Sequence, residues 1–274
     1  MQTRIPTRNF SYILATFFMK ITNNPILIIL FIPVAFIGCV KGATDPPTPP
    51  DAPKYCLVTK LYVQGDTSQT STKFTYDAQD RLVFWDGPGP VDNTIEYGNK
   101  SITIRAVAPY SGNYSIYYLN NDTTTNYSLT YIGGVLLDST LYFYDAYKFL
   151  IKSVRYTDAF GKDSVIMTYS NENLAKIVIY NSNATTSQAT FDYYTDSSKS
   201  WVYQNIGPYN NNGLYFPWLG RSNKNLIKSY SSDFNGNTQP ITITYQKNTD
   251  GYVANYTTNY MGTSDNHFLE YKCK

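Results

Sequence analysis

The sequence predicts an all-β protein: an antiparallel β-meander of about 14 to 17 short strands, forming a single domain whose sheet is barrel-like or strongly curved. Three observations predict this fold. Short runs alternate apolar and polar residues with period two, and turn residues interrupt these runs about every 10 to 15 residues. The composition, with 28 Tyr and 14 Phe, is typical of strands.

The chain opens with a segment that indicates export. Its apolar run, Pro25 to Ile37, is broken by Pro33 and is too short to span a bilayer as a helix, which needs roughly 20 apolar residues. Residues 1–38 are therefore expected to be a signal peptide that is cleaved. A start at Met19 gives a shorter leader of the usual form, so we expect translation to begin there.

The leader ends at Gly38 and Cys39, after Phe36 and Ile37. A small residue before a cysteine resembles the lipobox of bacterial lipoproteins, although Phe36 is bulkier than the Leu preferred there. The resemblance implies that Cys39 is lipidated and becomes the new N-terminus. It also implies a membrane partner through that anchor and an outer-membrane location, on the periplasmic face or at the cell surface. The alternative is a secretory signal with a chance cysteine.

Residues 39–55 are expected to contain the lipidated cysteine and a Pro-rich linker. Proline occurs at 46, 47, 49, 50 and 53. Because proline lacks an amide hydrogen and has a fixed φ, this stretch is expected to be a semi-rigid polyproline spacer. Without the leader the chain has 19 basic and 20 acidic side chains, a balance that predicts no nucleic-acid partner.

Lipidation of Cys39 leaves Cys56 and Cys273, which lie at the two ends of the folded part, residues 56–274. In an oxidising compartment an even remainder of cysteines predicts a disulfide. A Cys56–Cys273 bond would close a loop of about 218 residues, for which the chain-entropy model gives about 5 kcal/mol. The alternative is two reduced cysteines that are buried separately.

The folded part is expected to be one all-β domain made of successive hairpins. Period-two alternation is clear at Ser101–Val107, Val165–Tyr169 and Pro240–Tyr245. Strict alternation favours antiparallel strands with one buried face. The turn signals are Asp86–Pro90, Gly98–Asn99, Ser111–Asn113, Asn120–Asp122, Gly133–Gly134, Asn171–Asn173, Asn210–Gly213, Asn235–Gly236 and Asp250–Gly251.

One unit recurs along these hairpins: a strand closes on Tyr, a polar turn follows, and the next strand opens on an apolar residue. Copies occur at Phe74–Leu82, Leu141–Ile151, Val165–Ile177 and Ile243–Tyr252. The stretch from Tyr76 to Leu82 resembles one copy of the tyrosine-aspartate repeat of wall-associated and toxin-shell proteins, except that Asp80 stands where that repeat has Gly.

Taken whole, the chain resembles a family of Bacteroidetes secreted lipoproteins that carry a domain of unknown function with a porin-like fold. The shared elements are the lipobox at Cys39, Cys56–Lys60, Phe74–Leu82, Asn225–Lys228 and Tyr271–Cys273. The resemblance implies an exported β-meander with no known activity. A lipid-tethered soluble domain is expected rather than an embedded barrel, because the strands look shorter than the roughly 9 to 11 residues of membrane strands and their second faces carry Thr, Ser, Lys and Asn.

No catalytic site, cofactor or metal site is predicted. His267 is the single histidine, no G-x-S-x-G surrounds a serine, and His and Cys are not clustered. The acidic turns at 233–237 and 248–251 resemble calcium loops but lack the closing Glu, so plain turns are expected. A glycoside hydrolase with paired carboxylates is the less favoured enzyme alternative.

The best candidate for binding is the aromatic segment 201–218. Its rings belong to Trp201, Tyr203, Tyr209, Tyr215, Phe216 and Trp218. Aromatic faces beside Asn side chains suit sugar stacking, whereas the alternative is that these rings plug an open end of the barrel. We therefore expect a non-catalytic binding or interaction module, with a polysaccharide or an envelope protein as partner. A structural or adhesive surface role is the alternative.

Overall fold

The structure is a computed structural model that describes residues 55–63, 71–87, 92–157, 161–183, 186–197, 216–233 and 240–274. All of them belong to one compact unit, residues 51–274. The expectations for the signal peptide, the start at Met19, the lipidation of Cys39 and the linker before Tyr55 lie outside the described residues.

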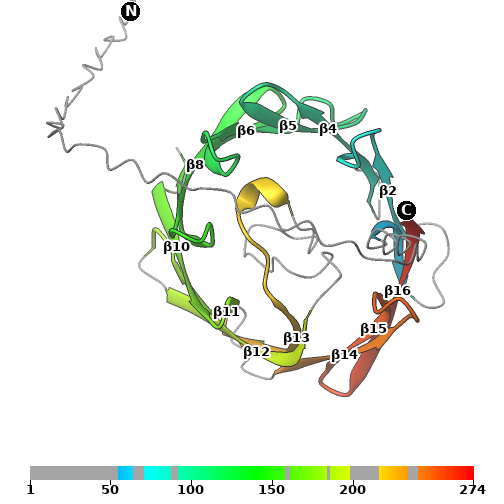
Figure 1. Cartoon of the computed structure of the whole chain (residues 1–274). Helices are drawn as coiled ribbons and strands as arrows, with labels where there is room; N and C mark the ends of the chain where they lie inside the picture. The colour runs from blue at the N-terminus through cyan, green and yellow to red at the C-terminus, as the bar shows by residue number, and fades with distance from the viewer. Residues whose placement is uncertain are drawn as a thin grey trace, which may run out of the picture. The chain divides into compact units, whose positions relative to one another are not determined.

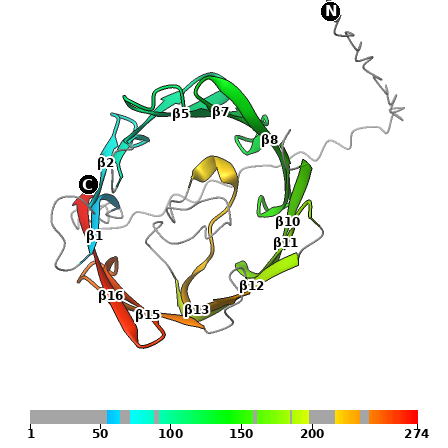
Figure 2. The same ribbon diagram turned by 180° about the vertical axis from the view of Figure 1, so that it is seen from behind.

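Within the described residues, sixteen strands form one closed antiparallel barrel (Figures 1 and 2). The strands are β1 (Cys56–Val63), β2 (Thr72–Tyr76), β3 (Leu82–Asp86), β4 (Asn93–Tyr97), β5 (Ser101–Ala106), β6 (Tyr114–Leu119), β7 (Thr125–Ile132), β8 (Val135–Tyr144), β9 (Leu150–Thr157), β10 (Gly161–Ser170), β11 (Asn173–Tyr180), β12 (Thr186–Ser197), β13 (Asn225–Ser232), β14 (Ile241–Lys247), β15 (Val253–Tyr260) and β16 (Thr263–Cys273). Each strand pairs with its neighbours in the chain, and β1 pairs with β16. The predicted meander is confirmed, and its sheet is closed.

The first and last strands close the barrel. Their register runs from Cys56 opposite Cys273 to Val63 opposite His267. A disulfide joins Cys56 to Cys273, so the predicted pairing is confirmed and the alternative of two separate thiols is excluded. The backbone amide of Lys274 also donates to the carbonyl of Tyr55. We call the end of the barrel at which Tyr55 and Lys274 lie the terminal mouth.

Apolar side chains and one inserted segment fill the inside of the barrel. Val58, Val165, Ile177, Ile243 and Tyr256 are almost completely buried. A short 3₁₀ helix, η1 (Pro217–Leu219), lies within the ring of strands in both views (Figures 1 and 2). Its neighbour Phe216 and its own Trp218 belong to the same hydrophobic cluster as the strand residues. In the part that the structure describes, a packed hydrophobic cluster therefore occupies much of the lumen.

The outer face of the barrel differs from one side to the other. On β14 and β15 the outward positions alternating with buried Ile243 and Tyr256 are polar, as at Thr244 and Thr257. On β8, by contrast, Leu141 and Phe143 are 38% and 44% exposed. The expectation that the second faces carry Thr, Ser, Lys and Asn therefore does not hold for β8.

Several strands are also longer than the sequence suggested. β8 and β10 have 10 residues, β16 has 11 and β12 has 12. The physical reason is that tight two-residue turns, such as Gly133–Gly134 between β7 and β8, leave more of the chain to the strands. No helix in the described part of the chain is both long and apolar enough to cross a membrane.

A recurring contact of tyrosine hydroxyls lies at the terminal mouth. Tyr76 and Tyr169, which close two copies of the sequence unit, and three further tyrosines on even-numbered strands each donate the hydroxyl to a backbone carbonyl at or near the start of the preceding strand, whereas Tyr144 of another copy lies 3.5 Å from the carbonyl of Trp218. The pairs are Tyr76 to Val58 (2.8 Å), Tyr97 to Leu82 (2.9 Å), Tyr169 to Leu150 (3.1 Å), Tyr193 to Leu174 (2.8 Å) and Tyr271 to Val253 (2.7 Å). We call these bonds the tyrosine clasps. Each acceptor is a backbone carbonyl, so the clasps account for the closing Tyr of the unit and not for the apolar residue that opens the next strand.

The turns that follow the strands repeat as well. The side-chain oxygen of Asp145 accepts the backbone amides of Tyr147 and Phe149, each at 2.9 Å. Asp77 and Asn248 make the same two contacts in their own turns. The fourth residue of each turn is left-handed, with φ of 60° at Asp80, 68° at Lys148 and 83° at Gly251. Asp80 therefore occupies the position that the tyrosine-aspartate repeat gives to Gly, which adopts this conformation without strain.

Candidate functional site

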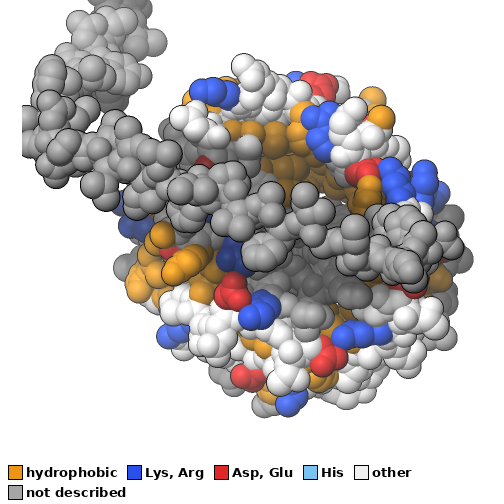
Figure 3. Space-filling view, in the orientation of Figure 1, with side chains coloured by type: hydrophobic (Ala, Val, Ile, Leu, Met, Phe, Trp, Pro, Cys, Tyr) orange, Lys and Arg blue, Asp and Glu red, His pale blue; other side chains and the backbone are white. Residues whose placement is uncertain are grey.

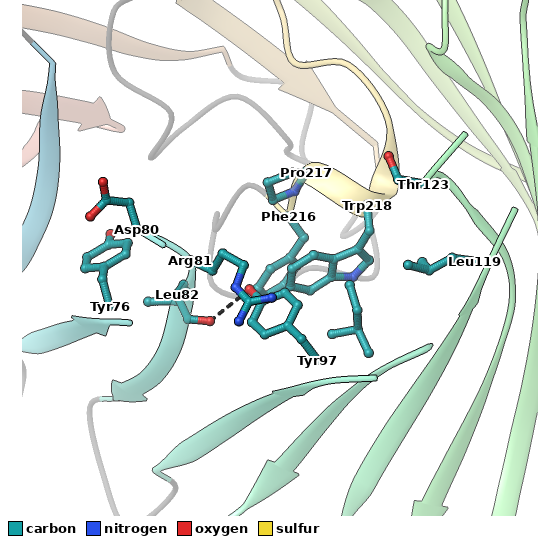
Figure 4. Close-up of a pocket in the computed structure, with 11 residues that line it drawn as sticks. Tyr76, Asp80, Arg81, Leu82, Tyr97, Leu119, Thr123, Phe216, Pro217 and Trp218 are labelled. Atoms are coloured by element: carbon teal, nitrogen blue, oxygen red, sulfur yellow. Dashed lines mark hydrogen bonds between the residues drawn. The ribbon is translucent and has the colours of Figure 1, made fainter. Parts of the chain in front are cut away.

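A cavity of about 520 Å³ lies inside the barrel at the terminal mouth, between η1 and the inner faces of strands β2 to β6. Figure 3 shows hydrophobic side chains gathered on the inner side of the wall at β4, β5 and β6, and Figure 4 shows the lining. The described lining residues are Tyr76, Asp80, Arg81, Leu82, Tyr97, Ile102, Leu119, Thr123, Phe216, Pro217 and Trp218.

The inserted segment is held in place by backbone contacts around η1. Pro217 occupies the first turn, where its missing amide hydrogen leaves no hydrogen bond unmade. The carbonyl of Trp218 accepts the hydroxyl of Thr125 at 2.8 Å. At Gly220 φ is 100°, and a Cβ would lie 2.6 Å from the carbonyl oxygen of Lys148. Only glycine combines this φ with so close an approach to the Lys148 carbonyl, so Gly220 lets the segment turn tightly against the wall.

Beyond Gly220 an ion-pair cluster fastens the same segment to the β10–β11 turn. Glu172 accepts hydrogen bonds from Arg221 at 2.8 Å and from Lys224 at 3.0 Å. The bonds from Lys224 and then from Arg221 lower the pKa of Glu172, so this carboxylate is charged at neutral pH. Asn223 accepts the amide of Leu174 at 2.8 Å. Residues 218–224 are thus attached to the wall within η1 and along the segment that follows it.

Aromatic rings form the wall between the cavity and the core. The ring centroid of Trp218 lies 4.8 Å from that of Phe216, 6.1 Å from Tyr97 and 6.2 Å from Tyr117. Trp85 packs on the far side of Phe216, with centroids 5.8 Å apart. Trp218 and Phe216 are only 4% and 6% exposed, so they bury large apolar area while one edge lines the cavity.

The charged side chains of the mouth are paired with one another. Arg81 bonds Asp77 through two nitrogens at 2.8 and 2.7 Å, and its guanidinium lies 4.4 Å from the ring centroid of Tyr97. Asp80 accepts hydrogen bonds from Lys274 and Tyr55, which lower its pKa in that order. These contacts tie the two ends of the chain to the β2–β3 turn beside the cavity.

The tyrosine hydroxyls of the lining are also engaged, because Tyr76 and Tyr97 are two of the clasp residues. Burial raises the pKa of Tyr97 to about 12, and it raises the pKa of Tyr76 as well. Both hydroxyls are therefore neutral donors whose hydrogen goes to a backbone carbonyl.

Of the six aromatic residues that the sequence nominated for binding, the structure brings Phe216 and Trp218 together in the cavity wall. Trp201, Tyr203, Tyr209 and Tyr215 lie outside the described residues. The sequence prediction of binding residues did not include the lining residues from β2 to β6. Alternation marked Ile102 as a buried position, and the recurring unit marked Arg81 and Leu82, but neither signal shows which residues meet at one mouth.

The remaining candidates from the sequence are elsewhere. His267 lies on the inner face of β16, where its ring stacks on Tyr256 at 4.4 Å, and burial lowers its pKa. The turn at 248–251 uses the oxygen of Asn248 for backbone amides, as a plain turn does. Most of the acidic turn at 233–237 lies outside the described residues. Where the chain is described, no three His, Cys, Asp or Glu side chains are grouped to hold a metal ion.

Comparisons with known proteins identify the fold. A porin-like protein from Bacteroides uniformis ATCC 8492 matches with a TM-score of 0.60 and 14% identity, over 78% of this chain and 96% of that one. A porin-like protein from Bacteroides vulgatus ATCC 8482 matches with a TM-score of 0.55 and 15% identity, over 78% and 98%. No family model matches the chain, and no curated protein matches it. The likeness shows a shared porin-like β-barrel fold.

Proposed function

We propose that this chain is a non-catalytic binding module of the cell envelope, tethered to the outer membrane by lipid at Cys39, and that the cavity at the terminal mouth takes up one small ligand. The observation that carries the proposal is the cavity itself. Its volume of about 520 Å³ falls in the range of small-molecule sites, roughly 300 to 1,000 Å³, and its walls are mainly apolar and aromatic. The porin-like fold of the similar structures supports an envelope location.

The construction of the site supports binding over a purely structural role. A chain that only needed to plug the barrel would gain most by filling the space beside η1, since buried voids are destabilising. Here Gly220, Glu172 and Thr125 hold η1 at a distance from Leu119 and Ile102 that leaves room for a guest.

Glycan binding was the specific expectation for the aromatic segment. Four of its six rings lie outside the described residues, so the expectation stays a proposal for Trp201, Tyr203, Tyr209 and Tyr215. The two described rings face into the barrel, an arrangement that suits a short enclosed ligand better than a polysaccharide lying across an exposed surface.

Ligand-observed NMR against a panel of small neutral compounds and short oligosaccharides tests the binding proposal. Leu119→Trp fills the cavity from β6 and should abolish any saturable binding without lowering Tm. Leu141→Trp makes the same change on the exposed outer face of β8 and should leave binding intact. The cavity would be refuted as the binding site if binding survived Leu119→Trp. It would also be refuted if no compound of the panel bound to the wild-type protein.

The anchor is tested separately by metabolic labelling with an alkyne fatty acid. The mature wild-type chain should carry the label and should partition with outer membranes. Cys39→Ala should lose both properties while the domain keeps its fold, because Cys39 precedes the barrel in sequence. Labelling that persists in Cys39→Ala would refute lipidation at this residue.

A further inference from the structure

The indole nitrogen of Trp218 stands apart from the other polar atoms of the cavity lining. It is buried and has no hydrogen-bond partner, and among the described lining residues it alone has both properties. The side chain is 4% exposed, and Figure 4 shows its ring within the cavity beside Leu119. Buried N–H groups in folded proteins are almost always paired, so a donor left open beside a cavity points to an acceptor on a ligand.

The other polar groups of the lining have little left to offer. Tyr76 and Tyr97 donate to backbone carbonyls, and Arg81 is paired with Asp77. Thr123 donates its hydroxyl to the carbonyl of Asp122 at 2.6 Å. Among the described lining residues, the indole N–H of Trp218 is therefore the buried donor without a partner, whereas the N–H groups that Arg81 does not use belong to a side chain that is half-exposed and ion-paired with Asp77.

This inventory separates two classes of ligand. A sugar carries hydroxyl groups on most of its carbons, and each loses its water on entering the cavity and needs a protein partner in exchange. Leu82, Ile102 and Leu119 supply none. An apolar molecule loses little hydration and gains by contact with these side chains and with the Trp218 ring.

We infer, on the basis of the proposed function, that the cavity selects a predominantly apolar ligand carrying one hydrogen-bond acceptor, such as a ketone, ester or amide carbonyl, which accepts the indole N–H of Trp218. The acceptor fixes the orientation of the ligand, and the aliphatic and aromatic side chains around it supply the affinity. Arg81 and Asp80 are already ion-paired with Asp77 and Lys274, and an uncharged ligand adds no charge to them, so binding should depend weakly on salt.

Equilibrium dialysis with two probes of closely similar shape tests the inference. Benzophenone carries a carbonyl, and diphenylmethane has a methylene in its place. The full mature chain should bind the ketone about tenfold more tightly than the hydrocarbon, the size expected for one hydrogen bond to a buried donor. Trp218→Phe should remove this preference and still bind diphenylmethane, because the ring is kept and only the donor is lost.

Trp85→Phe is the matched control. The Trp85 indole nitrogen is also buried without a partner, and the ring packs on Phe216 in the same cluster, but it is not part of the cavity lining. This variant should keep the tenfold preference. Measuring Tm for both variants shows whether they are folded before binding is compared.

The outcomes separate the ligand class from the proposed function. Equal binding of the two probes, or a preference that survives Trp218→Phe, overturns the inference about the acceptor while the cavity remains a binding site. Short oligosaccharides that bind and are excluded by Leu119→Trp overturn the apolar class and leave the proposed function standing. Probe binding that Leu119→Trp does not affect overturns both.

Discussion

At the scale of single residues, polar side chains complete the backbone of the turns at the terminal mouth. Asp145 shows how this is done, because one carboxylate oxygen accepts two amides that the tight turn leaves without a strand partner. Asn248 makes the same contacts with an amide oxygen. Stabilisation of the turn therefore requires a side-chain Oδ1 that accepts the two amides, and it does not require a negative charge.

Asp145→Ala should destabilise the protein by about 1 to 2 kcal/mol, because two backbone amides lose their acceptor. Asp145→Asn should stay within about 0.5 kcal/mol of wild type, because it reproduces the arrangement of Asn248. Tyr147→Ala changes an exposed side chain in the same turn and serves as a control. Urea denaturation measures all three, and equal loss in the Ala and Asn variants would show that the charge matters instead.

His267 gives the barrel a pH dependence of its own. Burial against Tyr256 lowers the pKa of His267 from its ordinary value of 6.5, and Asp265 opposes this only in part. A lowered pKa means that the folded state takes up the proton less readily than the unfolded state. The stabilising effect of the neutral ring is thus present above about pH 6.5 and is lost as the pH falls through the folded pKa.

Tm of the wild type should therefore fall more steeply than Tm of His267→Gln between about pH 7.5 and pH 5. Glu172 and Asp80, whose pKa values are lowered by their ion pairs, contribute to both proteins and act mainly below that window. The difference between the two curves isolates the histidine. Parallel curves would mean that the ring is protonated equally well in the folded protein.

At the scale of elements, the tyrosine clasps join the end of one strand to the start of its predecessor. Tyr169→Phe should destabilise by about 1 kcal/mol, because the carbonyl of Leu150 loses a buried donor while the ring and its packing on Phe149 remain. Tyr193→Phe should do the same, and the double variant should be additive within about 0.5 kcal/mol if the clasps act independently. Tyr180→Phe, on an exposed ring, is the control. A clasp variant as stable as this control would show that the hydroxyl bond has no net effect.

The elements were predictable from sequence wherever their cause is local. A hairpin is specified by a Tyr, a polar turn and an apolar residue that follow one another within about ten positions. Asn248 and Asp77 can each be recognised as turn residues from the side-chain type alone. The cavity was not predictable in this way. Leu119 and Trp218 meet only because β6 and η1, about a hundred residues apart, enter the same mouth after the sheet has closed. Strand geometry places Leu119 on the same face as Tyr117, but the sequence of β6 does not show which face is turned inward or what lies across the lumen.

At the scale of the whole molecule, closure depends on two strands at opposite ends of the sequence. β1 and β16 pair from Cys56 to Val63, and the disulfide joins the strand ends at the terminal mouth. Asp80 then holds Lys274 and Tyr55 against the β2–β3 turn. The cavity lies directly beside this seam, because its lining includes Asp80, which bonds Tyr55 and Lys274, and Tyr76, which bonds Val58 of β1. Opening the seam should therefore weaken ligand binding as well as stability.

Removing the disulfide tests how far closure depends on it. The Cys56→Ser/Cys273→Ser variant should unfold at a lower Tm, and its free energy of unfolding should fall by up to about 5 kcal/mol. The reason is that the unfolded chain is no longer closed into a loop of about 218 residues and gains conformational entropy. Its far-UV circular dichroism should match wild type, since the β1–β16 register extends well beyond the cysteines to Val63 and His267 and the hydrogen bonds there remain. Adding a reductant should lower Tm of the wild-type protein to that of the variant and leave the variant unchanged, which excludes any effect of the reductant elsewhere. A variant with wild-type Tm would show that strand pairing alone closes the barrel, whereas loss of the strand signal would show that the bond is required for folding.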